Sequence, residues 1–176
     1  MYPVYVFLKT ENRKGRNIND MGEQILIAED DADINNLLAK ILRTEHFKPI
    51  QAFSGTEAKL LFMHNTPDLI LLDLMLPGLS GEELLSELRE NLSSDVPVII
   101  LSAKIALADK VSLLKMGADD YITKPFSLSV LLLKIEAHFR RRQEKTEAGK
   151  MISGDIVFIA GEMKVLILSL IHISEP

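Results

Sequence analysis

The chain of 176 residues contains no cysteine and no tryptophan, and aromatic residues make up only 6% of it. Without cysteine the protein has no disulfide, no thiolate nucleophile and no thiolate zinc site, which fits a reducing compartment. No apolar run approaches the roughly 18–20 residues that cross a bilayer, and the apolar stretch at residues 2–8 lacks the basic flank of a signal peptide. We therefore expect a cytoplasmic protein without membrane contact.

An excess of positive charge is also missing, since the formal net charge is -5. This argues against a protein that wraps nucleic acid over its whole surface. Apolar residues make up 47% and charged residues 26% of the chain, which is typical of a globular protein and excludes a disordered or fibrous one. The length accommodates one domain of ordinary size and leaves a remainder too short for a second.

Short runs rich in leucine and β-branched residues alternate with segments of helical period between Gln24 and about Arg142. Five strands are predicted, at residues 25–28, 49–52, 69–74, 96–101 and 120–123. Their strict alternation with five helices predicts a parallel sheet with helices on both faces, a three-layer α/β sandwich. In such a sheet, ligands bind at the edge formed by the carboxyl ends of the strands.

The first helix is expected to be capped by Asp31 or Asp33 and to face the sheet with one apolar stripe. That stripe consists of Ile34, Leu37, Leu38, Ile41 and Leu42. Two later helices begin with the pattern of a capping box, Ser54 with Glu57 and Ser80 with Glu83. The fourth helix is predicted over about residues 106–116, before Gly117, and Ser127 caps a fifth that runs into residues 140–142.

Polar residues lie near or just after the ends of four of the predicted strands, at the expected ligand edge: Glu29, Asp30, Asp73, Ser102 and Lys124. Asp73 stands between apolar residues, where burying its charge costs several kcal/mol unless something offsets it. Carboxylates gathered at one edge would raise one another's pKa without a cation, and Mg²⁺ prefers such ligands. One carboxylate could then attack a phosphoryl group, with Lys124 and Ser102 as partners of the new phosphate oxygens.

Each of these residues also has an ordinary structural interpretation. A single aspartate at a strand end most often caps a helix or forms a turn. Lys124 could be an exposed loop lysine, Ser102 a helix cap, and Tyr121 a filler of a half-buried strand position. Their joint placement at one edge of the sheet favours the functional interpretation.

Four motifs stand in order at this edge: Ile25-Leu-Ile-Ala-Glu-Asp-Asp31, Leu71-Leu-Asp-Leu-Met-Leu-Pro-Gly78, Ile100-Leu-Ser-Ala103 and Ala118-Asp-Asp-Tyr-Ile-Thr-Lys-Pro-Phe126. With them, residues 24–142 resemble the receiver domain of two-component response regulators. The resemblance implies a flavodoxin-like, doubly wound (β/α)5 fold. It also implies a phosphoacceptor with at most autodephosphorylation activity, and not an enzyme.

The same resemblance assigns the site residues. Asp73 would accept a phosphoryl group from a sensor histidine kinase, and Ser102 and Lys124 would bind the phosphate. Mg²⁺ would be held by Glu29, Asp30, Asp73 and the backbone carbonyl of Met75. Tyr121 would be the switch residue that rotates after phosphorylation, and the peptide between Lys124 and Pro125 would be cis.

The fourth helix, fifth strand and fifth helix resemble those of the OmpR/PhoB-type subfamily, whose receivers form homodimers through this face. Salt bridges across such a dimer are expected from Lys110, Asp119, Asp120, Lys134 and Arg141. One departure is Val130, where the subfamily usually carries an acidic residue. At least one bridge across the dimer is therefore not expected here.

Two flanking regions lie outside the receiver. Residues 1–23 are an N-terminal extension, and Met21 is an alternative to Met1 as the biological start. Residues 143–151 are expected to be a polar linker, with strand-like stretches at 155–160 and 163–168. Residues 152–167 resemble the first strands of the subfamily's winged-helix DNA-binding domain, without its recognition helix. Residues 168–176 resemble a translated sequencing-library adapter, and we expect them not to be biological.

The sequence therefore predicts a response regulator whose intact parent controls DNA binding and transcription, so that DNA is a partner of that parent only. One alternative is a stand-alone receiver that signals by protein contact. A more remote alternative is an aspartyl-phosphate phosphohydrolase, which usually needs a second aspartate two residues after the nucleophile; Met75 stands there.

Overall fold

The structure is a computed structural model that describes residues 22–103, 107–148, 150–153, 156–159 and 164–167. Side chains are described over residues 22–103 and 111–142. The chain divides into two compact units, Met1–Pro125 and Phe126–Pro176, and each is described by itself. No helix in the described part is both long and apolar enough to span a bilayer.

The first unit is built on a five-stranded parallel sheet, as the alternation of strands and helices predicts. Its strands are β1 (Gln24–Ala28), β2 (Lys48–Ala52), β3 (Leu69–Asp73), β4 (Val98–Ser102) and β5 (Asp120–Thr123), in the order β2-β1-β3-β4-β5. Strands β3 and β4 are fully buried and β1 is buried after Gln24, and all three are almost entirely apolar, as strands covered on both faces should be. The order reverses between β1 and β3, and a ligand crevice is expected at their carboxyl ends.

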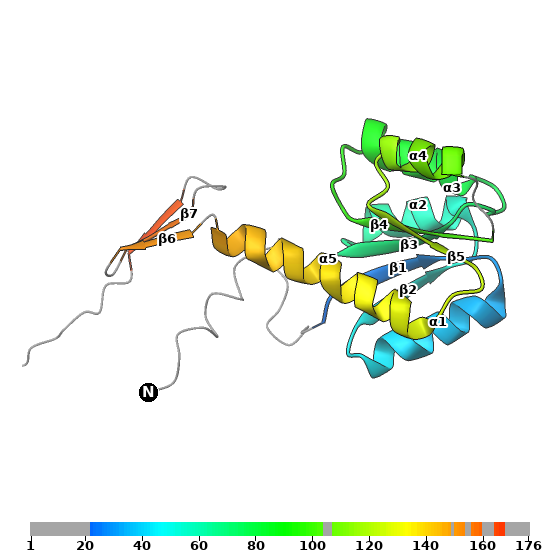
Figure 1. Cartoon of the computed structure of the whole chain (residues 1–176). Helices are drawn as coiled ribbons and strands as arrows, with labels where there is room; N and C mark the ends of the chain where they lie inside the picture. Colours follow the sequence, from blue (N-terminus) through cyan, green and yellow to red (C-terminus); the bar gives the residue numbers. More distant parts are fainter. Residues whose placement is uncertain (1–21, 104–106, 149, 154–155, 160–163, 168–176) are drawn as a thin grey trace, which may run out of the picture. The chain divides into compact units, whose positions relative to one another are not determined.

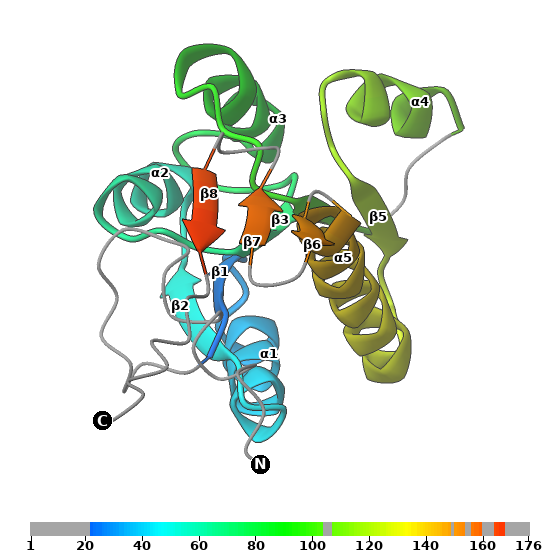
Figure 2. The same cartoon turned by 90° about the vertical axis from the view of Figure 1, so that its left-hand side faces the viewer.

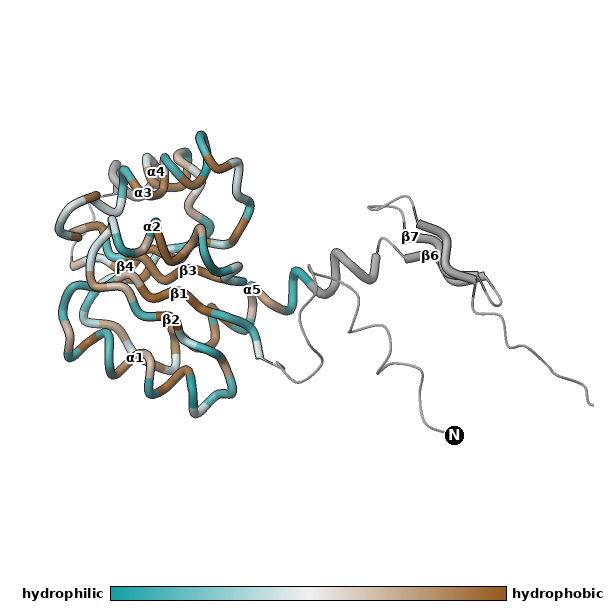
Figure 3. The backbone as a smooth tube through the Cα atoms, turned by 180° about the vertical axis from the view of Figure 1, so that it is seen from behind, coloured by the Kyte–Doolittle hydropathy of each residue, from teal (hydrophilic) through white to brown (hydrophobic). Residues whose placement is uncertain are grey.

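Helices cover both faces of this sheet. Helix α1 (Ala32–Thr44) lies on one face, and α2 (Gly55–His64), α3 (Gly81–Ser86) and α4 (Leu107–Lys115) lie on the other (Figure 1). The π-helical turn η2 (Glu87–Asn91) continues α3. Hydrophobic residues concentrate in the strands between these layers (Figure 3), and the core on the side of α2, α3 and α4 includes Leu26, Ile70, Leu72, Leu84, Leu85 and Ile100.

Helix α1 is capped by Asp31, whose Oδ1 accepts hydrogen bonds from the N–H groups of Asp33 and Ile34. The predicted apolar stripe is partly wrong. Leu38 and Leu42 are buried, but Leu37 is 48% exposed, and Asn35 and Ala39 are buried in its place. The helix is rotated because the Asn35 amide is drawn inward by two backbone carbonyls, a polar requirement that hydrophobic periodicity does not register.

The other helix ends follow the sequence signals closely. Ser80 and Glu83 form a complete capping box at α3. At α2 the Ser54 hydroxyl accepts from Glu57 N–H, but the Glu57 carboxylate binds the N–H of Phe53, one residue before the expected position. Helix α4 ends before Gly117, whose φ of +99° is the left-handed conformation that glycine adopts without strain.

The second unit contains α5 (Leu128–Ala148) and a small antiparallel sheet. Helix α5 begins after Ser127 as predicted but continues to Ala148, so most of the residues predicted as a linker are helical. The strands of the small sheet are β6 (Lys150–Ser153), β7 (Ile156–Ile159) and β8 (Lys164–Ile167), with β7 in the middle (Figure 2). Strands β7 and β8 fall in the two predicted stretches, and β6 was not predicted. Residues 1–21 and 168–176 lie outside the described residues.

Candidate phosphoacceptor site

Three carboxylates meet at the carboxyl ends of β1 and β3. Asp73 is the last residue of β3, and Glu29 and Asp30 follow β1, which pairs with β3 in parallel. One oxygen of each carboxylate lies within 4.8 Å of the others. Glu29 is 1% exposed and Asp73 5%, whereas Asp30 faces solvent. The adjacency of the two strands, and not any nearness along the chain, therefore assembles a half-buried acidic site.

Lys124 contributes a cation to this cluster from the loop after β5. Its Nζ donates hydrogen bonds to Glu29 Oε2 at 2.6 Å and to Asp73 Oδ2 at 2.7 Å. Burial acts to lower the pKa of Lys124, but hydrogen bonds to the two carboxylates and attraction by their charges outweigh burial and raise that pKa. Lys124 therefore remains an ammonium ion, and it is not the exposed loop lysine of the ordinary interpretation.

Glu29 is held in an environment that disfavours its charge. Burial is the largest cause and raises its pKa, the nearby Asp73 carboxylate raises it further, and the hydrogen bond from Lys124 acts against both. With Glu29, Asp30 and Asp73 ionised, three negative charges face one ammonium, so the cluster has a net charge of −2. An open cluster of carboxylate oxygens with this net charge suits a hard divalent cation such as Mg²⁺.

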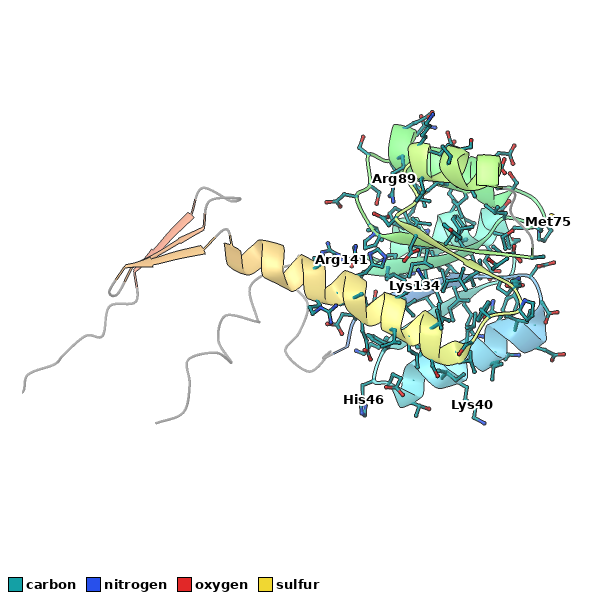
Figure 4. All side chains as sticks on the ribbon, in the orientation of Figure 1. Lys40, His46, Met75, Arg89, Lys134 and Arg141 are labelled. Atoms are coloured by element: carbon teal, nitrogen blue, oxygen red, sulfur yellow. The ribbon has the colours of Figure 1, made fainter. Side chains whose placement is uncertain are left out.

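Two backbone N–H groups orient the buried carboxylates. Met75 N–H donates to Asp73 Oδ1 at 3.0 Å, and Asp31 N–H donates to Glu29 Oε1 at 3.2 Å. Met75 itself is 78% exposed and lies at the rim of the unit, where the chain leaves β3 (Figure 4). Each buried carboxylate thus has one oxygen on a backbone amide and the other on Lys124, and neither is free to turn.

Ser102 is on β4, the strand next to Asp73, and Tyr121 is on β5, the strand beyond β4. Ser102 is the buried last residue of β4, next to β3, and its carbonyl accepts a hydrogen bond from Lys124 N–H at 2.6 Å. Tyr121 is half-buried in β5 opposite Ile100 and packs against the core on the side of α2, α3 and α4. The peptide between Lys124 and Pro125 is cis, as the resemblance implies.

Comparison with known proteins agrees with this geometry. A family model described as the response regulator receiver domain matches residues 25–136, more than half of the chain. The chain belongs to the response regulator receiver family. Among solved structures, the receiver domain of the Francisella response regulator 1452 aligns with a TM-score of 0.66 and 36% identity, covering 69% of this chain and 99% of that one.

Two curated relatives of this receiver are longer proteins. The sensory transduction protein RegX3 of Mycolicibacterium smegmatis is 40% identical over 141 residues, which cover 80% of this chain and 60% of RegX3. The phosphate regulon transcriptional regulatory protein PhoB of Escherichia coli is 43% identical over 122 residues, which cover 69% of this chain and 53% of PhoB. The chain thus spans little more than half the length of these relatives.

The receiver also contains an arginine clasp, which we define as Arg89 with its four acceptors and which sequence patterns did not reveal. Arg89, on the side of the sheet covered by α3 and α4 (Figure 4), donates to the carbonyls of Gly117, Ser94 and Val96 at 2.8–2.9 Å and to Asp119 Oδ2 at 3.0 Å. Asp119 is thus already paired within its own chain, and its pairing across a dimer stays a prediction. Lys110, another predicted dimer residue, has a side chain outside the described residues.

Proposed function

We propose that this receiver accepts a phosphoryl group on Asp73 from a sensor histidine kinase, and that it acts as a phosphoacceptor with at most autodephosphorylation activity. The observation that carries the proposal is the arrangement of Asp73 with Glu29, Asp30 and Lys124 at one edge of the sheet. A buried aspartate that only capped a helix would not need two further carboxylates and an ammonium around it.

In the proposed reaction, a carboxylate oxygen of Asp73 attacks the phosphorus atom of the donor. An oxygen–phosphorus bond forms and the phosphorus–nitrogen bond of the phosphohistidine breaks, with its electron pair leaving on the imidazole. The N–H of Met75 and the ammonium of Lys124 hold the two carboxylate oxygens of Asp73 in a fixed orientation for this attack. The product is an acyl phosphate on Asp73.

The other site residues have roles toward the transferred group. Lys124 reaches Asp73 already and can bind a phosphate oxygen through a charge-assisted hydrogen bond. The Ser102 hydroxyl, on the neighbouring strand, suits the same purpose. Tyr121 is proposed as the switch, since it packs on the core next to Ile100, two residues before Ser102 along β4.

Mg²⁺ is the proposed cofactor, held by Glu29, Asp30, Asp73 and the carbonyl of Met75. The fit rests on the three carboxylates, each with one oxygen within 4.8 Å of the others, and on the net charge of −2 that they make with Lys124. When bound, the ion supplies positive charge that offsets the carboxylates and the oxygens of a phosphoryl group. Asp30 is the exposed member of the set and gives the cation access from solvent.

The role of the intact parent is likewise a proposal. We infer that residues 24–142 are the receiver, 143–151 the connection and 152–167 the start of a winged-helix domain, in a cytoplasmic protein that controls transcription. Support comes from the longer relative PhoB, whose name describes transcriptional regulation, and from the antiparallel strands β6, β7 and β8. We also propose homodimers formed through α4, β5 and α5, with cross-dimer pairs drawn from Lys110, Asp119, Asp120, Lys134 and Arg141.

The phosphoacceptor is tested by incubating the chain with acetyl phosphate and Mg²⁺ and measuring its intact mass. We expect a mass gain of one phosphoryl group that Asp73→Asn and chelation of Mg²⁺ each abolish. Asp68→Asn is the matched control, because Asp68 is also buried but lies before β3, where its carboxylate accepts from Gln24 N–H. A gain that survives Asp73→Asn would show that another residue is the acceptor.

A further inference from the structure

Asn35 is a completely buried polar residue in the apolar face of α1. Its Nδ2 donates to two carbonyl oxygens, Glu29 O at 2.8 Å and Ala52 O at 2.9 Å. Its Oδ1 accepts from Gln51 Nε2 at 3.0 Å. The two backbone carbonyls can only accept, so the NH2 group of Asn35 must face them and the orientation of its amide is determined chemically. Both N–H bonds of Nδ2 and the Oδ1 atom of this buried amide therefore have a partner, and two of the three partners are backbone carbonyls.

The Asn35 amide stands where the hydrogen-bond ladder between β1 and β2 ends. Both strands stop at the paired residues Ala28 and Ala52, and Glu29 N–H makes one further bond, to Ala52 O at 3.1 Å. Beyond that bond the ladder ends, because β1 continues into α1 and β2 into α2. The Glu29 carbonyl therefore needs a donor from outside the two strands. The side chain of Asn35 supplies that donor and, by binding Ala52 as well, ties the ends of both strands together.

The carbonyl that Asn35 holds belongs to the peptide that joins the two acidic residues after β1. Because a peptide group is planar, fixing the carbonyl of Glu29 also fixes the direction of Asp30 N–H and the start of the Asp30 backbone. Asp31, the next residue, caps α1 and also accepts the N–H of Asn35 through its carbonyl at 2.9 Å. The segment from Glu29 to Asp31 is therefore closed into a ring by the first turn of α1.

We propose that Asn35 is a positioning residue for the acidic site: by holding the Glu29–Asp30 peptide it presents both carboxylates to one divalent cation and so sets the affinity of the site for Mg²⁺. This inference rests on the proposed function. Asn35 is not one of the proposed ligands or phosphate-binding residues, and it would act through the backbone of two proposed ligands. Groups that orient metal ligands in this way typically change metal affinity about 10–100-fold when removed.

A purely structural role for Asn35 makes a different prediction, because it would change the stability of α1 and not the affinity of the folded site. Leu42→Ala serves as the control for that role. Leu42 is a buried apolar residue of the same helix, two turns further from the acidic cluster. Gln51→Met is a second control, since it removes the donor to Asn35 Oδ1 and leaves both bonds to the carbonyls in place.

The test titrates the full chain with MgCl₂ at constant ionic strength and follows the backbone amide resonances at 30 and 73 by NMR. Wild type is compared with Asn35→Leu, Asn35→Asp, Leu42→Ala and Gln51→Met, at a temperature where circular dichroism shows every variant folded. Asn35→Asp keeps the shape of the side chain and removes its donors, so it provides a second variant if Asn35→Leu does not fold. In parallel, the rate of phosphorylation by acetyl phosphate is measured as a function of Mg²⁺.

We expect both Asn35 variants to raise the Kd for Mg²⁺ about tenfold or more, and both controls to keep the wild-type value. The half-saturating Mg²⁺ for phosphorylation should rise with the Kd, while the rate at saturating Mg²⁺ stays near wild type. Wild-type affinity in the Asn35 variants, or an equal loss in Leu42→Ala, would overturn the inference alone. If wild type itself shows no saturable shifts, the proposed function and this inference are both overturned.

Discussion

Lys124 Nζ lies 2.7 Å from Asp73 Oδ2, although the two residues are 51 positions apart in the chain. The same nitrogen lies 2.6 Å from Glu29 Oε2, so one ammonium bridges two buried carboxylates from adjacent strands. The bridge explains how β3, a buried and otherwise apolar strand, can end in a charged residue. It also places Lys124 in competition with any divalent cation for the same oxygens, and both cations serve the same electrostatic need.

Replacing Lys124 by methionine should destabilise the protein chiefly when divalent cations are absent. The substitution leaves Glu29 and Asp73 buried beside each other without a cation, which costs about 3 kcal/mol. Urea unfolding in EDTA and in millimolar Mg²⁺ measures the effect, and we expect Mg²⁺ to recover a large part of it. Lys40→Met, on the exposed face of α1, is the control. Equal losses with and without Mg²⁺ would contradict a shared role for the two cations.

Gly81→Ala, in the first turn of α3, should displace Asp73, the proposed phosphoacceptor. A Cβ at Gly81 would overlap the carbonyl oxygen of Asp73 and lie 2.6 Å from Leu74 Cα, both of them backbone atoms that cannot yield easily. We expect a loss of about 1–3 kcal/mol of stability together with slower phosphorylation of Asp73. Glu82→Ala, at the exposed neighbouring position, should change stability by no more than about 0.5 kcal/mol. Unchanged phosphorylation in Gly81→Ala would show that the strand end tolerates displacement.

The capping box of α3 should make stability depend on pH. Hydrogen bonds from the backbone N–H and the hydroxyl of Ser80 lower the pKa of Glu83 below its ordinary value of 4.5. A lowered pKa in the folded state means that ionised Glu83 stabilises the fold above pH 4.5, and that this contribution disappears as the pH falls through the lowered value.

Glu83→Gln should therefore be less stable than wild type at pH 7, and the difference should shrink under acid conditions. Ser80→Ala should cost about 1 kcal/mol at pH 7 and weaken the pH dependence without abolishing it, because the backbone N–H at 80 still donates. Thermal unfolding between about pH 3 and about pH 7 measures both effects. A constant difference between Glu83→Gln and wild type would rule out the ionised capping box.

The arginine clasp should be worth more than an ordinary surface ion pair. Arg89→Met removes donors to three carbonyls and to Asp119, and we expect a loss of at least about 2 kcal/mol in urea unfolding. Arg89→Lys should recover little, since an ammonium cannot reproduce the planar fork of the guanidinium. Lys59→Met removes the more exposed pair with Glu87 at 2.9 Å and should cost no more than about 1 kcal/mol. Similar losses for Arg89→Met and Lys59→Met would contradict the clasp.

Local sequence signals were sufficient for much of the fold. The five strands, the caps at Asp31, Ser54 and Ser80, and the left-handed Gly117 all depend on residues within a few positions of one another. The hydrophobic periodicity of α1, however, wrongly predicted that Leu37 is buried. Period counts apolar residues only, and the rotation of α1 depends on Asn35, whose partner carbonyl at Ala52 lies 17 positions away.

The site was predictable in composition but not in its internal arrangement. Glu29, Asp30 and Asp73 were expected together because parallel strands bring their carboxyl ends to one edge. Nothing near Lys124 in the chain indicates that it bridges Glu29, 95 positions away. Asn35 and Arg89 were missed for the same reason, since a polar residue on a helix is usually solvated unless distant backbone groups require it.

What the sequence by itself determined is the order of strands and helices, the positions of their ends and the identity of the acidic residues. These depend on backbone preferences and side-chain alternation, which act between neighbours in the chain. The tertiary structure alone decided which cation faces Asp73, which buried amide holds the Glu29–Asp30 peptide, and that Asp119 turns to Arg89. Buried charges and amides must find partners wherever the fold brings them, and distance along the chain does not limit that choice.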